Sequence, residues 1–267
     1  MIPAGRISVA FIGFGEVGQR FSSDLCRGGL AELTAYDILP ERLASAGALG
    51  VQPAASAAAA CRDVAVVISA VTADAAEKVA EEARAYLKPG QIFFDINSAA
   101  PSTKKRAALH VEASGAAYVE GAVMGPVRVP GIGVAILAGG PAAEVASTVL
   151  NGLGFHVTPV AREHGKASAI KLCRSIVIKG LEALMVDCAA ASAMAGVSGE
   201  VYASLGETFP SIDWPALAET TAERVATHGI RRSAEMREAA KMLAEMGLVP
   251  TLAQAVADAQ ERGARKA

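Results

Sequence analysis

The segment from Ile7 to Gly18, ISVAFIGFGEVG, constrains the fold of this 267-residue chain more than any other. It joins an apolar run to three glycines in G-x-G-x-x-G spacing, and a helical pattern follows directly. Gly13 permits a tight turn, Gly15 lets a bound group approach the backbone, and Gly18 allows a helix to pack closely on a strand. A helix that begins here offers N–H groups and a partial positive charge to an anion. The segment therefore predicts a strand, a phosphate-binding turn and a helix.

Further β-rich runs alternate with helical patterns up to about residue 160. The seven β-rich runs are Ile7–Ile12, Leu33–Tyr36, Val64–Ala70, Ile92–Asp95, Tyr118–Val123, Val134–Ala138 and Phe155–Val160. Helical patterns separate the first four runs, and those at Asp74–Leu87 and Ser102–Ala113 extend the alternation. Such alternation predicts an α/β fold with a doubly wound, mainly parallel sheet of the Rossmann type.

The β signal stops after Val160, and residues 164–195 have the pattern of one helix interrupted only by Gly180. At 1.5 Å per residue this helix is about 48 Å long, too long for a crossover helix, so we expect it to bridge two domains. Three or four further helical segments predict an all-helical second domain. The expected domains are residues 1–162 and residues 163–267. Because the second has little core of its own, we expect a homodimer.

Charge and hydropathy exclude several classes of partner. A formal net charge of -2 gives no field that attracts nucleic acid or an anionic membrane, so a small-molecule partner is expected. No apolar run approaches the ~20 residues that span a bilayer, and the amino terminus runs into a strand rather than forming a signal peptide. We therefore expect a soluble, cytoplasmic protein.

The cysteines and histidines form no recognisable site. The four cysteines lack C-x-x-C spacing and are expected to be buried, reduced thiols: Cys26, Cys61, Cys173 and Cys188. The histidines are scattered and no H-E-x-x-H motif occurs, so no metal site is expected: His110, His156, His164 and His228.

An acidic residue ends the second β-rich run, at Asp37, 19 residues after Gly18. A carboxylate here can accept hydrogen bonds from the adenosine ribose hydroxyls and repels a 2′-phosphate, which predicts NAD rather than NADP. Arg42 keeps NADP possible, and Asp37 can instead cap a turn or helix. The residues expected to contact the cofactor are Gly13, Phe14, Gly15, Glu16, Val17, Gly18, Asp37, Val71, Thr72 and Asn97.

Two later segments, DINSAAPSTKK (residues 95–105) and HGKASAIKLCRS (residues 164–175), resemble the β-hydroxyacid dehydrogenase family, of which 6-phosphogluconate dehydrogenase is a relative. The first resembles the family's D-x-S-T-x-x-P substrate loop, with Asn97 and Ser98 at the serine and threonine positions. The second resembles G-x-G-x-x-x-K-x-x-x-N: Lys171 is retained, whereas Ser175 replaces the asparagine. Residues 121–126 resemble the family's A-P-V-S-G-G loop, with Met124 in place of its serine. HGIRRSAEMREAA resembles a short helical module of unassigned function.

The resemblance implies that Lys171 is the general base for alcohol oxidation and the general acid in reverse, while a hydride passes between the same carbon and the nicotinamide. This role needs a neutral amine, which desolvation and a neighbouring positive charge such as Arg174 favour. The spacing of four residues places Lys171, Ser175 and Lys179 on one face of the expected helix. The residues expected to contact substrate are Asn97, Ser98, Met124, Gly125, Arg174, Ser175 and Arg231.

Structural alternatives exist for several of these residues. Lys171 and Lys179 can be solvated lysines, and Asn97 with Ser98 can cap the helix that follows. A charged face in the last domain can hold an anionic group or form an exposed or dimer surface: His228, Arg231, Arg232 and Glu235.

The expected function is hydride transfer between a nicotinamide cofactor and a small hydroxy acid, or a related polar alcohol, that carries a negative charge. An imine reductase on the same scaffold is the nearest alternative. A decarboxylating sugar-phosphate dehydrogenase and a non-catalytic NAD(P)-binding protein are further ones.

Overall fold

The structure, a computed structural model, describes residues 6–265. The predicted entry from the amino terminus into a strand falls in part on residues 1–5, outside the described residues. The chain divides into two compact units, Met1–Lys171 and Leu172–Ala267, called here the sheet unit and the helical unit. The division lies nine residues later than the expected domain boundary, inside a helix.

The sheet unit is built on one eight-stranded sheet. Its strands are β1 (Ile7–Ile12), β2 (Ala31–Tyr36), β3 (Gln52–Pro53), β4 (Val66–Ser69), β5 (Ile92–Asp95), β6 (Ala117–Val123), β7 (Ala135–Gly139) and β8 (His156–Ala161). Their order is β3-β2-β1-β4-β5-β6-β7-β8. Every neighbouring pair is parallel except β6 and β7, so the predicted mainly parallel, doubly wound sheet is confirmed.

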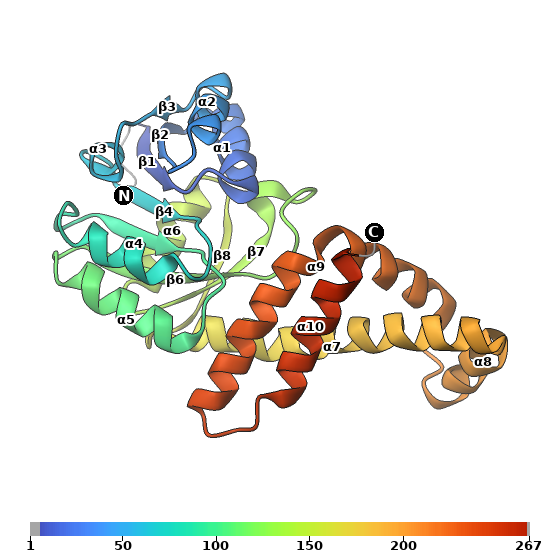
Figure 1. Cartoon of the computed structure of the whole chain (residues 1–267). Helices are drawn as coiled ribbons and strands as arrows, with labels where there is room; N and C mark the ends of the chain where they lie inside the picture. The colour runs from blue at the N-terminus through green and yellow to red at the C-terminus, as the bar shows by residue number, and fades with distance from the viewer. Residues whose placement is uncertain (1–5, 266–267) are drawn as a thin grey trace. The chain divides into compact units, whose positions relative to one another are not determined.

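Helices cover both faces of the sheet (Figure 1). They are α1 (Glu16–Gly28), α2 (Pro40–Ala48), α3 (Ala57–Cys61), α4 (Ala76–Ala83), α5 (Pro101–Glu112) and α6 (Ala143–Gly152), with a short 3-10 turn at Gly131–Gly133. Val9 and Phe11 of β1 pack with α1, α2 and α6, whereas Ala10 and Ile12 pack with α3, α4 and α5. The alternation explains why these strands are apolar throughout.

The element boundaries correct two predictions in the sheet unit. The sequence pattern missed β3, which has two residues, contains Pro53 and pairs only with β2 at the sheet edge. The predicted helix Asp74–Leu87 is shorter, because α4 ends at Ala83 in tightened turns such as Arg84 N to Glu81 O.

The helical unit contains most of α7 (Lys166–Ala195), together with α8 (Ser198–Thr208), α9 (Trp214–Glu245) and α10 (Thr251–Arg265). The long helix is confirmed at 30 residues, about 45 Å. Gly180, the one break in the helical sequence pattern, lies within α7, which continues through it. Helices α9 and α10 lie side by side (Figure 1), and a Cβ at Gly229 of α9 would stand 2.2 Å from Gln260 O of α10.

The cysteine prediction is correct in part. All four cysteines are free, and Cys61 is buried on α3. Cys188 is half-buried, whereas Cys26 and Cys173 are exposed, so the expectation of burial is wrong for these two. Both occupy helix positions that face away from the core. Among the helices described, none combines the length and the apolar character that a membrane span requires.

Candidate functional site

The glycine turn after β1 has the geometry that a phosphate group requires. Gly13 has a φ of 89°, and a Cβ there would lie 2.4 Å from Ala70 O; a Cβ at Gly18 would lie 2.7 Å from Gly13 O. Gly15 differs, because a Cβ there would meet no atom within 4 Å. Gly15 is also the N-cap of α1, and no side chain of residues 6–265 caps this helix end. The turn therefore fits the pyrophosphate of a dinucleotide, with the backbone at Gly15 facing open space.

Asp37 is held beside this turn at the carboxyl end of β2. Its Oδ2 accepts a hydrogen bond from Phe14 N at 2.6 Å, and its Oδ1 accepts one from Leu39 N at 2.9 Å. The carboxylate thus orders the turn that leads into α2 and contacts the glycine turn. Asp37 is half-buried, so the carboxylate is anchored beside the turn without being fully enclosed.

Asn97 connects the ends of two neighbouring strands. Its Oδ1 accepts a hydrogen bond from Val71 N at 2.6 Å, and its Nδ2 donates to Ser69 Oγ at 3.0 Å. The alternative that Asn97 and Ser98 cap the following helix is wrong, because Ala100 is the N-cap of α5 and no described side chain caps this helix. Ser98 Oγ is buried and has no hydrogen-bond partner within residues 6–265.

A buried ion pair lies beneath this loop. Lys104 and Asp95 have side chains 0% and 1% exposed, and Lys104 Nζ lies 2.8 Å from Asp95 Oδ1. Tyr118 donates its hydroxyl hydrogen to Asp95 Oδ2 at 2.7 Å, and Asn97 N donates to Asp95 Oδ1 at 2.9 Å. Burial, followed by the Asp95 charge, raises the pKa of Tyr118. Sequence reasoning missed Lys104, because a lysine in an amphipathic helix ordinarily faces solvent.

The parallel strands bring several predicted residues of the sheet unit to one sheet edge, because the carboxyl ends of β1, β2, β4, β5 and β6 meet there. The residues that follow these ends are the glycine turn, Asp37, Val71, Thr72, Asn97, Ser98, Met124 and Gly125. Met124 and Gly125 are half-buried, and Thr72 is exposed. Lys171 is the half-buried last residue of the same unit.

Ser175 belongs to the helical unit and is buried in a polar cluster. It donates a hydrogen bond to the Glu235 carboxylate, and Lys179 Nζ lies 3.2 Å from Ser175 Oγ and 2.9 Å from Glu235 Oε1. Since Lys179 is 8% exposed, the alternative that it is a solvated lysine is wrong. The Ser175 hydroxyl hydrogen is used within the protein, which leaves this oxygen only an acceptor position for a ligand.

The predicted charged face of α9 is divided. Arg232 contacts Glu182 of α7, and Glu235 contacts Ser175 and Lys179, so these two side chains face α7. Arg231 is exposed, as is Arg174 of α7.

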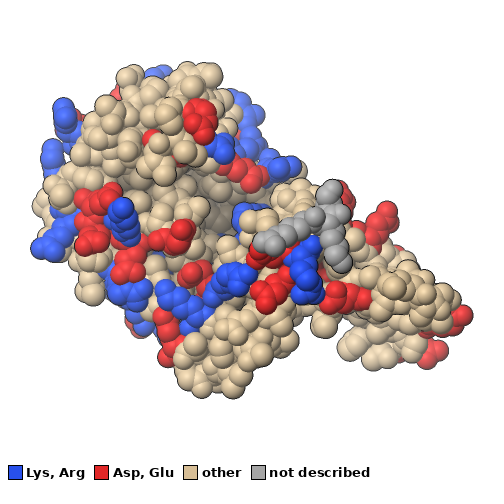
Figure 2. Space-filling model, viewed as in Figure 1, with Lys and Arg blue, Asp and Glu red and all other residues tan. Residues whose placement is uncertain are grey.

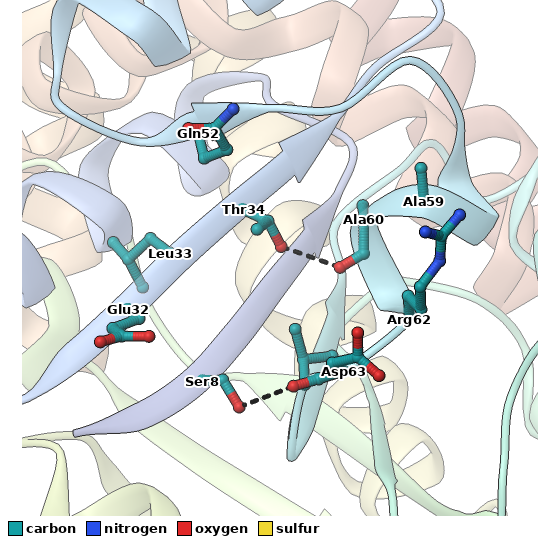
Figure 3. A pocket seen from close by; sticks show the side chains of 10 residues that line it. Ser8, Glu32, Leu33, Thr34, Gln52, Ala59, Ala60, Arg62 and Asp63 are labelled. Carbon is teal, nitrogen blue, oxygen red and sulfur yellow. Dashed lines mark hydrogen bonds between the residues drawn. The ribbon is translucent and has the colours of Figure 1, made fainter. Parts of the chain in front are cut away.

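A surface pocket of about 440 Å³ lies elsewhere, among β1, β2 and α3 (Figure 3). Ser8 and Glu32, near the amino ends of β1 and β2, line it, and Thr34 Oγ1 donates to Ala60 O at 2.9 Å. This is the sheet edge opposite the glycine turn, so the pocket is separate from the predicted cofactor site.

Charged side chains of both signs are interspersed over the visible face of the sheet unit (Figure 2). Within residues 6–265, no three His, Cys, Asp or Glu side chains are grouped in a way that could hold a metal ion.

Comparisons with known proteins agree with this geometry. Residues 8–160 match the NAD binding domain of 6-phosphogluconate dehydrogenase, and residues 191–263 match a domain of unknown function (DUF1932). A conserved hypothetical protein from Sinorhizobium meliloti 1021 is 34% identical, with 98% of this chain and 90% of that one covered and a TM-score of 0.82.

Two further similar proteins have named activities. A 3-hydroxyisobutyrate dehydrogenase from Pseudomonas aeruginosa is 28% identical, over 74% of this chain and 67% of that protein. An imine reductase from Streptomyces aurantiacus shares the fold, at 22% identity and a TM-score of 0.61, with 97% of this chain and 95% of that one covered.

The family match covers more than half of the chain, including the glycine turn, Asp37 and the Asn97 loop. This chain therefore belongs to the family that carries the NAD-binding domain of 6-phosphogluconate dehydrogenase.

Proposed function

We propose that this protein is an NAD-dependent oxidoreductase that interconverts a small hydroxy acid, or a related polar alcohol, with its carbonyl form. The observation that carries the proposal is the retention of Lys171 at the lysine position of the family motif, in the same compact unit as the glycine turn. A protein that binds a dinucleotide but catalyses no reaction would not need this lysine.

In the proposed reaction, residues of the sheet unit bind the cofactor and transfer the proton. Residues Gly13–Gly18 and Asp37 hold the dinucleotide, which when bound supplies the hydride acceptor. Lys171, as a neutral amine, takes the proton of the substrate hydroxyl as the carbonyl forms, and returns it in the reverse direction. Ser98 Oγ, which is buried without a partner among the described residues, can donate a hydrogen bond to a substrate oxygen.

The preference for NAD over NADP rests on Asp37. Its carboxylate is anchored beside the glycine turn by Phe14 N and Leu39 N, so it cannot readily turn away from a 2′-phosphate. Like-charge repulsion then disfavours NADP. A tighter Kd for NADPH than for NADH would contradict this preference.

An anionic substrate is proposed because Arg174 and Arg231 are exposed cations, and Arg231 lies in the segment matched to the domain of unknown function. We also propose a homodimer formed through the helical unit, in the cytoplasm. Val177 and Leu184 are 67% and 68% exposed and seven residues apart, and so present one apolar stripe on α7. A monomeric mass in light scattering would contradict dimerisation.

Imine reduction is the second candidate. Met124 replaces the serine of the family loop, which removes a hydroxyl donor, and an imine reductase shares the fold. The acceptor position left on Ser175 would suit the N–H of an iminium ion.

The test is reduction of NAD and NADP over a library of hydroxy acids and amino alcohols, together with NADH oxidation by ketones and imines. We expect turnover of hydroxy acids with NAD, and a loss of two to four orders of magnitude in kcat for Lys171→Ala with the NADH Kd unchanged. Equal kcat in Lys171→Ala would refute the catalytic role. Turnover of imines alone would favour the second candidate, and NADH binding without any turnover would favour a non-catalytic protein.

A further inference from the structure

Glu120, in the middle of β6, is a fully buried carboxylate that the proposed chemistry does not use. Its Oε1 accepts a hydrogen bond from Ala167 N at 2.9 Å, and its Oε2 accepts one from Ser168 Oγ at 2.8 Å. Gly139 of β7 is its partner in register, and a Cβ there would lie 2.4 Å from Oε1. The carboxylate is thus enclosed between the sheet and the first turn of α7.

This contact suits the chemistry of a helix start. The first N–H groups of a helix have no partner within the helix and carry a partial positive charge, so a carboxylate is a favourable ligand for them. A buried carboxylate is costly unless hydrogen bonds satisfy it, and here Ala167 N and Ser168 Oγ do so, one at each oxygen. Glu120 and the start of α7 therefore stabilise each other.

Lys171 follows Ala167 by four residues and Ser168 by three, so it lies one turn further along the same side of α7. The division between the two compact units falls directly after Lys171. The part of α7 that carries the lysine consequently belongs to the sheet unit, and the side chain of Glu120 joins its first turn to β6 through hydrogen bonds from Ala167 N and Ser168 Oγ.

We propose that Glu120 is a positioning residue: it holds the first turn of α7 on β6, and so fixes Lys171 relative to the cofactor-binding edge of the sheet. This role of Glu120 rests on the proposed function, in which Lys171 is the general base.

The first test needs no substrate. Glu120→Gln keeps the size of the side chain and removes its charge, Ser168→Ala removes one of the two hydrogen bonds, and Ser147→Ala is the control. Ser147 is a buried serine on α6 of the same unit, 4% exposed against 3% for Ser168. Hydrogen–deuterium exchange read by mass spectrometry on the full-length protein should show about tenfold faster exchange over residues 164–172 in Glu120→Gln and Ser168→Ala, and no change in Ser147→Ala. Unchanged exchange over residues 164–172 in both Glu120→Gln and Ser168→Ala would overturn the proposal.

The second test is a double-mutant cycle on turnover. Glu120→Gln should lower kcat about tenfold with the NADH Kd unchanged, because a misplaced base acts less efficiently. In the Lys171→Ala background the same substitution should lower kcat no further, since Glu120 acts through Lys171. An equal loss in both backgrounds would overturn the proposal. Full turnover in Lys171→Ala would refute the proposed function instead, while exchange over residues 164–172 would still decide whether Glu120 holds the helix.

Discussion

Replacing Lys104 with methionine should destabilise the sheet unit far more than an ordinary lysine substitution does. Methionine is similar in volume, so the substitution Lys104→Met removes the charge and the donors without opening a large cavity. It leaves the Asp95 carboxylate buried, at 1% exposure, without its counter-ion.

The magnitude follows from the burial and the remaining partners. At 2.8 Å and an effective dielectric constant of about 20, the attraction between Lys104 and Asp95 is roughly 6 kcal/mol, much of it offset by desolvation. Removal of one member of a buried pair costs about 3–5 kcal/mol. Tyr118 OH and Asn97 N still donate to Asp95, so we expect about 3 kcal/mol.

Urea unfolding followed by circular dichroism measures the free energy of unfolding. The control is Arg106→Met on the same helix, because Arg106 pairs with Glu77 at 2.7 Å while 44% exposed. An exposed pair contributes about 1 kcal/mol or less. A loss in Lys104→Met no larger than in Arg106→Met would refute the burial argument.

Three further predictions concern the cofactor preference, the reactivity of the cysteines and the dependence of stability on pH. Asp37→Ser should lower the ratio of the NADPH Kd to the NADH Kd at least tenfold in fluorescence titrations; an unchanged ratio would contradict the role of its charge. Burial raises the pKa of Cys61 to about 12, so native maleimide labelling should modify Cys26 and Cys173 first and Cys61 only on unfolding; prompt labelling of Cys61 would be the contrary result. The pKa of Tyr118 is raised in the folded state, so its contribution to stability is complete below pH ~10 and is lost as pH rises further, by about 1.4 kcal/mol per pH unit. Tyr118→Phe should lack this slope in urea unfolding between pH 10 and 11, and an identical slope in both proteins would exclude Tyr118 as its source.

Local patterns in the sequence predicted the elements that the backbone dictates. The apolar runs at Ile7–Ile12 and Ile92–Asp95 are strands with those bounds, because both their faces are buried and their residues favour strands. The glycine turn was predictable too, since Gly13 and Gly18 have no room for a side chain.

Contacts between distant residues could not be predicted in the same way. Glu120 lies in an otherwise apolar strand, and its partners are 47 and 48 residues further along the chain. Ser175 donates a hydrogen bond to Glu235, 60 residues further along the chain. The spacing of residues on α7 alone could not predict that its hydroxyl group has this partner. Lys104 Nζ donates a hydrogen bond to Asp95 O, nine residues earlier in the chain. Helical periodicity does not predict this contact.

Binding of NADH to Gly15→Val tests the assignment of the cofactor site most directly. Gly15 has φ -73° and a Cβ there meets no atom of the described residues within 4 Å, so we expect a valine side chain here to be accommodated by the fold and to obstruct a bound ligand. Gly28→Val, at the other end of α1 and equally open, is the matched control. We predict an unchanged melting temperature for Gly15→Val with an NADH Kd at least a hundredfold weaker, and unchanged binding in Gly28→Val. Wild-type NADH affinity in Gly15→Val would contradict the assignment.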